Sequence, residues 1–137
     1  MLEIEVENGF CRVEHSRVNA MLETDLTPAR GGRGLSFSPT DLMAAAVGSC
    51  LGSTLEYEAR LMGMDLSGMG VSVKLKLCHL RENVQSLAVL VRLKKDIGAS
   101  RYDQLRKIAL ESTVVRSLAS NIQIDLEFSL APGYVPG

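Results

Sequence analysis

Apolar and polar residues alternate in four parts of the chain, and this period of two predicts half-buried strands. Residues 2–24 predict short strands: residues 2–6 alternate, the dipeptide Asn8-Gly9 is typical of a tight hairpin turn, and residues 10–24 continue as extended chain with mixed alternation. Residues 71–77 and 87–93 alternate again on either side of a short polar segment. They predict an antiparallel hairpin with one face on the core. Residues 122–128 predict a last strand.

A long helix is predicted to begin after Ser38. Ser38 suits the N-cap, Pro39 suits the first helical position, and Asp41 complements the positive end of the helix dipole. The helix extends to about Met62, and residues 42–55 within it carry no charged side chain. We expect that half to be buried on nearly all sides. Because a small monomer has little interior to cover it, we also expect a dimer interface there.

A second helix is predicted over residues 100–119, because apolar and small residues recur at spacings of three and four between Leu105 and Val115. Residues 25–37, with one proline and three glycines, predict a loop. The order of strands, long helix, hairpin, helix and strand indicates an α+β fold. We expect antiparallel sheets packed on the long central helix and the second helix, in a single domain covering residues 1–137.

Composition excludes several classes of function. The formal net charge of −1 gives no electrostatic case for nucleic acid or a membrane surface. No signal peptide and no apolar stretch of about 18–20 residues is present, so a cytoplasmic protein is expected. Cys11, Cys50 and Cys78 are widely spaced without a CxxC, which argues against structural disulfides. His15 and His79 are too few for a zinc site, and no metal or cofactor is expected.

Cys50 follows the run of small residues AAAVGS. One interpretation is that its thiol fills space in a packed helix, as free cysteines often do. The other is that the small side chains leave room beside a reactive thiol, which needs a nearby cation or helix N-terminus to favour its thiolate. Cys50 lies too far from the start of its own helix for that helix dipole to act. The candidate cations are Arg30, Arg33 and Arg116.

The segment SPTDLMAAAVGSCLGSTL, residues 38–55, resembles the OsmC/Ohr family of thiol-dependent peroxidases, named for osmotic induction and organic hydroperoxide resistance. The following GMDLSGMGVSVKLKL resembles the turn and strand that the family places next, so the resemblance covers nearly the whole chain. It implies an intertwined homodimer and Cys50 as the peroxidatic cysteine. In the implied reaction the thiolate attacks the O–O bond of an organic hydroperoxide, which gives an alcohol and a cysteine sulfenic acid. A second cysteine on the later helix then forms a disulfide that a dithiol reductant clears.

The chain departs from the family pattern at three places. Ser112 occupies the position of the second, resolving cysteine, and a serine cannot form the disulfide. The acidic residue ten positions before the thiol is replaced by Thr40, with Asp41 beside it, and Asp41 serves either the site or only the first helical turn. Arg33, in a glycine-rich turn, resembles the family's upstream arginine in its surroundings but lies only seventeen residues before Cys50. It either stabilises the thiolate or is a solvated loop charge.

These departures leave three functions open. The first is an OsmC-like peroxidase that uses Cys50 alone and an external thiol or dithiol reductant. The second is a homodimer of the same fold that has lost the redox cycle and binds a small apolar or acyl ligand. The third is a thiol sensor whose oxidation changes a partner contact. Cys78 has the parity of the solvent-facing Lys74 and Lys76, and Cys11 lies in a strand of uncertain register, so neither is expected to replace the resolving cysteine.

Overall fold

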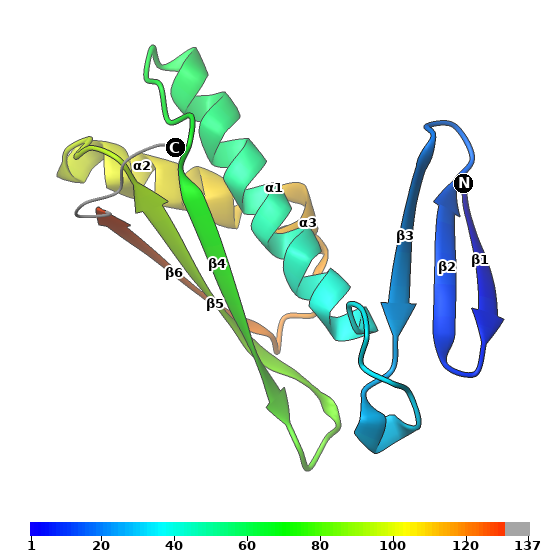
Figure 1. The fold of residues 1–137 in the computed structure, drawn as a ribbon. Coiled ribbons are helices and arrows are strands. Elements are labelled where there is room, and N and C mark those ends of the chain that lie inside the picture. Colours follow the sequence, from blue (N-terminus) through cyan, green and yellow to red (C-terminus); the bar gives the residue numbers. More distant parts are fainter. Residues whose placement is uncertain (131–137) are drawn as a thin grey trace. The chain divides into compact units, whose positions relative to one another are not determined.

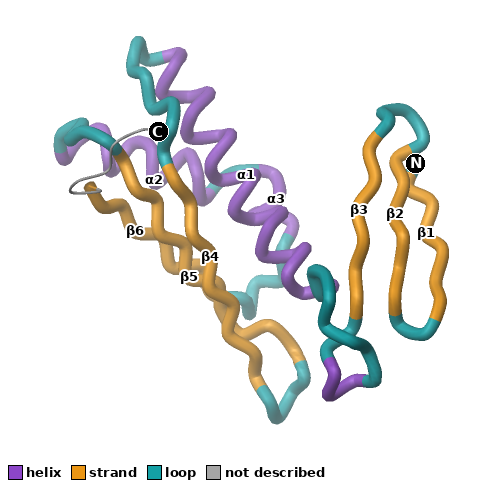
Figure 2. The backbone as a smooth tube through the Cα atoms, viewed as in Figure 1, coloured by secondary structure: helices purple, strands orange, loops and turns teal. Residues whose placement is uncertain are grey.

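The computed structural model of the protein describes residues 1–130 (Figures 1 and 2). The chain divides into two compact units, one of residues 1–43 and one that begins at Ala44. Within residues 1–130 no helix is long and apolar enough to cross a membrane. The α+β fold predicted from the sequence is confirmed, with helices and two three-stranded sheets.

The first unit contains an antiparallel sheet with strand order β1-β2-β3. Its strands are β1 Leu2–Glu7, β2 Phe10–His15 and β3 Ala20–Asp25. Asn8 and Gly9 connect β1 to β2, and both have positive φ, 51° and 81°. Positive φ at both central residues is what a type I′ hairpin turn requires, and asparagine and glycine tolerate it best. The predicted hairpin turn is therefore confirmed.

The loop after β3 is held by the buried carboxylate of Asp25. This side chain is 2% exposed, and its Oδ2 accepts hydrogen bonds from the backbone N–H groups of Arg33 and Leu35, each at 3.2 Å. The backbone N–H of Asp25 also donates to the carbonyl oxygen of Phe37 at 2.9 Å. One short 3-10 helix, Pro28–Arg30, lies within this loop. The loop predicted over this glycine-rich segment is confirmed, and the hydrogen bonds to Asp25 fix its conformation.

The second unit contains the strands β4 Gly70–Cys78, β5 Asn83–Leu93 and β6 Gln123–Leu130, in the order β4-β5-β6. β4 and β5 form the predicted antiparallel hairpin. β6 pairs with β5 in parallel, so the expectation of purely antiparallel sheets is wrong for this pair. The physical reason is the connection between them: helices carry the chain back to the start of β5, and a crossover of this kind joins parallel strands.

Residues 1–130 contain three α-helices: α1 Pro39–Leu61, α2 Ala99–Leu110 and α3 Thr113–Ser117. The first matches the long helix predicted from the capping signals around Ser38. The single helix predicted over residues 100–119 is wrong, because the chain breaks after α2. Ser112 adopts extended backbone angles, φ −67° and ψ 156°, and acts as the N-cap position of α3. The β-branched run that follows Ser112 has a low helix propensity, which is consistent with a break there.

The core of the second unit is aliphatic. From α1 it takes Val47, Leu51, Leu55 and Ala59, which repeat every four residues and are fully buried. Gly48 and Gly52 lie on the neighbouring row of α1 and allow it to approach β4. A Cβ added at Gly48 would lie 2.7 Å from a Val73 methyl, and one at Gly52 would lie 3.2 Å from a Val71 methyl. Two of the small residues near Cys50 therefore serve close packing between helix and strand. The most deeply buried apolar residues of this unit are Val47, Leu51, Leu55, Ala59, Leu87, Val89, Val91, Leu93, Leu105 and Ala109.

The uncharged half of α1 is not buried on all sides by its own chain. Ala45, Ala46, Ser49 and Ser53 are exposed. The hydroxyl of Ser49 donates to the Ala45 carbonyl oxygen at 2.6 Å, and that of Ser53 donates to the Ser49 carbonyl oxygen at 2.7 Å. The two serines are thus satisfied by the helix backbone. The side chains on this face of α1 are small, uncharged and exposed.

Candidate functional site

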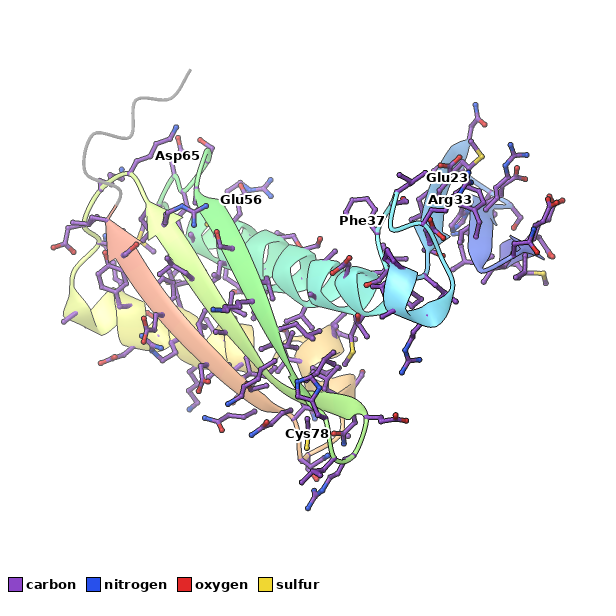
Figure 3. The ribbon with its side chains drawn as sticks, turned by 60° about the horizontal axis from the view of Figure 1, so that its bottom comes forward. Glu23, Arg33, Phe37, Glu56, Asp65 and Cys78 are labelled. Atoms are coloured by element: carbon purple, nitrogen blue, oxygen red, sulfur yellow. The ribbon has the colours of Figure 1, made fainter. Side chains whose placement is uncertain are left out.

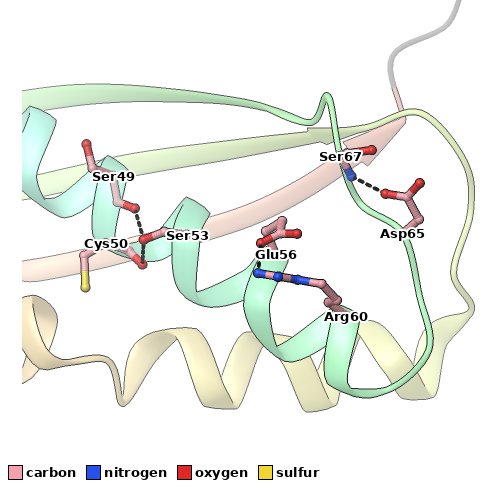
Figure 4. Close-up of polar contacts among 7 residues, drawn as sticks. All are labelled: Ser49, Cys50, Ser53, Glu56, Arg60, Asp65 and Ser67. Carbon is pink, nitrogen blue, oxygen red and sulfur yellow. Dashed lines mark hydrogen bonds and ion pairs between the residues drawn. The ribbon is translucent and has the colours of Figure 1, made fainter.

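Cys50 lies near the middle of α1 on the side that faces the α2–α3 connection. Val47 and Leu51 are buried in the core and fix the rotation of α1 about its own axis. The Cys50 side chain therefore lies at the edge of the buried face of the helix. It is half-buried, and its sulfur points away from the exposed Ser49 (Figure 4). The thiol is therefore neither a fully enclosed filler nor a freely solvated group.

The surroundings of Cys50 favour its thiolate. Burial raises the pKa of the thiol, but three hydrogen-bond donors lower it: the backbone N–H of Val114 and the hydroxyls of Ser112 and Thr54. Together the donors outweigh burial, and the pKa of Cys50 lies below its ordinary value. A lowered pKa increases the fraction of the nucleophilic form at neutral pH.

Ser112 is the most informative of these donors. Its side chain is 7% exposed, and its Oγ has no hydrogen-bond partner of standard geometry. The same hydroxyl lies close enough to the Cys50 sulfur to lower the pKa of the thiol. Ser112 also makes no side-chain cap for α3. A buried hydroxyl without a fixed partner is free to turn toward a thiolate when one forms.

Val114 contributes through the backbone. It lies in the first turn of α3, where N–H groups have no acceptor within the helix. Directing such an N–H toward Cys50 satisfies the donor and stabilises negative charge on the sulfur. The break between α2 and α3 is therefore what creates two of the three donors.

Thr54 and Ser112 also line a shallow groove between α1 and the α2–α3 connection. Its volume is about 470 Å³. Both residues contribute to the surroundings of the Cys50 sulfur as well, so the groove is contiguous with the thiol. Among the lining residues are Thr54, Tyr57, Glu58, Glu111, Ser112 and Thr113.

Asp41 has a structural partner. Its Oδ2 accepts the backbone N–H of Ser38 at 2.9 Å, and its own N–H donates to the Ser38 hydroxyl at 3.1 Å. This reciprocal pair is a capping box. The Ser38 hydroxyl also lies 3.1 Å from the Thr40 hydroxyl. Capping accounts for the position of Asp41, and a catalytic role for it stays a prediction.

Arg33 lies in the first unit, and Cys50 lies in the second. Arg33 is exposed in its loop (Figure 3), where its backbone N–H bonds to Asp25. The groups that lower the pKa of Cys50 are uncharged donors, and none of them is an arginine. A role of Arg33 at the thiol stays a prediction.

The other cysteines lie on strands. Cys11 pairs with Val6 and Thr24 in the sheet of the first unit. Cys78 ends β4 beside the β4–β5 turn (Figure 3). All three cysteines, Cys50 included, are free thiols. Across residues 1–130 no group of three or more histidine, cysteine, aspartate or glutamate residues is placed to hold a metal ion.

Comparison with known proteins identifies the family. The family model described as OsmC-like protein matches residues 31–127, a range that includes Cys50 and Ser112. The chain belongs to the OsmC-like family. The family assignment inferred from the cysteine-containing helix is thus confirmed. No curated protein matches this OsmC-like sequence at a significant level.

Solved structures share the OsmC-like fold. A Psychrobacter arcticus protein, provisionally described as an osmotic stress induced and detoxification response protein, has a TM-score of 0.89 at 21% identity, over 93% of this chain and 94% of that one. The organic hydroperoxide resistance protein OsmC of Legionella pneumophila has a TM-score of 0.72 at 18% identity, over 94% and 95%. The organic hydroperoxide resistance protein OhrB of Bacillus subtilis has a TM-score of 0.67 at 17% identity, over 94% and 96%. At these identities the likeness shows the fold.

Two of the groups beside Cys50 were missed by sequence reasoning. Thr54 lies four residues after Cys50, and neighbours at that spacing share a helix face, so the spacing alone could have identified it. The N–H of Val114 had no signal in the sequence, because it becomes available only where the helix breaks.

Proposed function

We propose that this OsmC-like protein is a thiol-dependent peroxidase that reduces organic hydroperoxides through Cys50. The observation that carries the proposal is the set of donors around the Cys50 sulfur, which lowers its pKa at the position that the family resemblance assigns to the peroxidatic cysteine. The Legionella and Bacillus proteins of the same fold, both described as organic hydroperoxide resistance proteins, support this choice of substrate.

In the proposed reaction the Cys50 thiolate attacks one oxygen of the peroxide. An S–O bond forms, the O–O bond breaks, and the leaving alkoxide takes up a proton to become the alcohol. The sulfur is oxidised by two electrons to a sulfenic acid, and the peroxide is reduced by two electrons. The N–H of Val114 and the hydroxyl of Ser112 stabilise the thiolate before the attack. The same donors suit the oxygen that the sulfur acquires.

The cycle closes without an internal disulfide from α3. Ser112 occupies the place of the resolving cysteine and offers a hydroxyl instead of a thiol. An external thiol therefore attacks the sulfenic sulfur, forms a mixed disulfide and releases water, and a second thiol then restores Cys50. A thiol-rich reducing compartment such as the cytoplasm supplies this reductant, and the three free cysteines are consistent with it.

We propose that the protein acts as a homodimer of a single OsmC-like domain. The exposed face of α1 formed by Ala45, Ala46 and Ser49 is uncharged and small, which permits close approach of a second helix. In the first sheet, Leu2 and Ile4 are also exposed. In the homodimer that the family resemblance implies, a second copy of the chain would cover these exposed side chains. Sedimentation velocity tests this, since a monomer across the concentration range would contradict the dimer.

Turnover with an external dithiol tests the peroxidase. Consumption of an organic hydroperoxide in the presence of dithiothreitol is measured for the wild type, for Cys50→Ser and for the double variant Cys11→Ser/Cys78→Ser. The proposal expects turnover in the wild type and the double variant and none in Cys50→Ser. Equal consumption by wild type and Cys50→Ser contradicts it. Oxidation of Cys50 without turnover would instead point to the thiol sensor, and binding of a small apolar ligand that survives Cys50→Ser would point to the binding protein.

A further inference from the structure

The sheet β4-β5-β6 has one face that α1 does not cover. α1 packs on the opposite face, against the methyl groups of Val71 and Val73 of β4. Alternate side chains of a strand point to opposite faces, so the positions between the core residues lie on the other side of the sheet. We call that side the outer face, and it consists of Ser72, Lys74 and Lys76 of β4, Ser86, Ala88, Leu90 and Arg92 of β5, and Gln123, Asp125, Glu127 and Ser129 of β6.

The charges of the outer face are separated by strand. Exposed lysines, Lys74 and Lys76, lie on β4, whereas exposed carboxylates, Asp125 and Glu127, lie on β6. Lys74 pairs with Ala88, and Ala88 pairs with Asp125, so the cation and the carboxylate stand in one row on either side of β5. Two strand spacings put about 10 Å between their backbones. Among the described residues no ion pair joins the two edges of this face.

The middle of the outer face is hollow. Ala88 is small and exposed, and it lines a groove of about 480 Å³ between the charged side chains of β4 and β6. Arg92, which is also on β5, has its guanidinium directed toward β4, because it donates a hydrogen bond to the Ser72 Oγ at 2.5 Å. This arginine therefore adds to the basic edge.

We propose that the outer face is a contact surface for a second copy of this chain, with the basic edge of each copy on the acidic edge of the other. A two-fold axis parallel to β5 and midway between two such sheets places β4 of each copy over β6 of the other. Rotation about this axis keeps each residue at its level along the strands. Lys74 then faces Asp125 of the second copy. The Arg92 guanidinium, held at the level of Ser72, faces Glu127 of the second copy, since Ser72 and Glu127 share a row.

The charge pattern is what selects a second copy as the partner. A face with opposite charges on its two edges becomes its own complement after this rotation, and each pair of opposite charges occurs twice. A two-fold axis across the strands would instead place Lys74 on Lys74 of the second copy, and like charges disfavour that arrangement. The small Ser86 and Ala88 on the central strand let the two sheets approach closely enough for the longer side chains of the edges to meet.

The contact is expected to be weak and sensitive to salt. The face is three strands wide, so it buries less surface than a standard interface of roughly 1,600 Å². Its specific terms are ion pairs, which salt screens. The homodimer proposed above uses α1 and the first sheet, so this contact adds a separate step of association, in which dimers join. It is also independent of the chemistry of Cys50.

Sedimentation velocity over a concentration series, at low and at high ionic strength, tests the contact. At low ionic strength the wild type should show a reversible step that high salt weakens. Lys74→Glu and Asp125→Lys each set like charges against each other at both symmetric positions, and each should raise the dissociation constant of that step roughly ten-fold. The matched controls are Lys107→Glu and Asp103→Lys on the exposed side of α2, which make the same changes of charge away from the outer face. Both controls should associate like the wild type.

Mixing the two outer-face variants decides the geometry. When Lys74→Glu meets Asp125→Lys, both symmetric positions again hold opposite charges, so the mixture should associate about as tightly as the wild type. Because the same two proteins associate poorly alone, recovery on mixing also excludes misfolding as the cause of the weakening. The proposal is overturned if the wild type shows no salt-sensitive step, if the controls weaken that step as much as the outer-face variants do, or if mixing restores nothing. A failure of the α1 homodimer would leave this step as a monomer–dimer equilibrium with the same response to salt and substitution.

Discussion

Replacing Ser112 by alanine separates what its hydroxyl does for folding from what it does for Cys50. The side chain is 7% exposed and its Oγ has no hydrogen-bond partner. An unsatisfied buried hydroxyl costs about 1–3 kcal/mol, and alanine removes that group with little change in volume. No side-chain cap is lost, because Ser112 makes none. We expect Ser112→Ala to raise the free energy of unfolding by about 1 kcal/mol in urea denaturation, at a pH where the thiol is protonated.

The reactivity of Cys50 should change in the opposite sense. The Ser112 hydroxyl is one of the donors that lower the pKa of Cys50. Hydrogen bonds to ionised groups contribute about 1.5 kcal/mol or more, and losing that amount reduces the thiolate population roughly ten-fold at pH values below the pKa. Alkylation of Cys50 by iodoacetamide, followed by mass spectrometry over a pH series, should slow by about this factor. The midpoint of the plot of alkylation rate against pH should rise toward the ordinary pKa of a cysteine thiol.

Stability as a function of pH gives the same information through linkage. Because the folded-state pKa of Cys50 is lowered, the thiolate contributes stability above the unfolded-state pKa, and this is lost as the pH falls through the folded-state value. The stability difference between wild type and Cys50→Ser should therefore widen as pH rises through that window. In the Ser112→Ala background it should widen less.

Ser49→Ala is the matched control for these measurements. The Ser49 hydroxyl is next to Cys50 in sequence but donates to the Ala45 carbonyl oxygen at 2.6 Å. Its removal should leave alkylation unchanged. If Ser112→Ala destabilises the protein and also leaves alkylation unchanged, the hydroxyl is bonded elsewhere in the fold. That result would contradict a hydrogen bond from Ser112 to the Cys50 thiolate.

Five further substitutions, at four positions, test other parts of the account of the fold and the site. In urea denaturation, Gly48→Ala should lower the free energy of unfolding by about 1 kcal/mol, because the added methyl lies 2.7 Å from a Val73 methyl and overpacking outweighs the gain in helix propensity. Gly52→Ala, where the corresponding distance to a Val71 methyl is 3.2 Å, should leave the free energy of unfolding nearly unchanged. Asp41→Ala should cost about 1 kcal/mol through the lost cap, while Asp41→Asn should keep both stability and the Cys50 oxidation rate, and a slowed oxidation would assign Asp41 to the site. Ser112→Cys should form a disulfide with Cys50 after one equivalent of peroxide, seen as loss of two thiols, and persistent sulfenic acid would show that the two positions do not meet.

The parts of the fold predicted from sequence are those set by local signals. The capping residues around Ser38 locate α1, and alternation locates the β4–β5 hairpin. The parallel pairing of β6 depends on the path of the chain through α2 and α3, which alternation within residues 122–128 does not report. The break at Ser112 was hidden because a helical spacing of apolar residues continues through it.

As with the fold, only some residues of the candidate site could be predicted from the sequence. Cys50 and Ser112 are predicted by resemblance to the family, and the structure brings their side chains together, while their roles stay predictions. The sequence offers arginines as candidate stabilising groups, and that role stays a prediction; the groups that lower the pKa of Cys50 in the structure are uncharged donors. Such donors depend on where a backbone N–H and a hydroxyl point in space, and residue type does not encode this.

Single-turnover oxidation of Cys50 decides whether this residue is a peroxidatic thiol. Reduced protein is mixed with an organic hydroperoxide or with hydrogen peroxide, and the sulfenic acid is trapped with a dimedone probe and located by mass spectrometry, with Cys50→Ser as control. We expect rapid oxidation at Cys50, faster with the organic peroxide, and slow reaction at Cys11 and Cys78. Oxidation of Cys50 no faster than that of the other two thiols would contradict it.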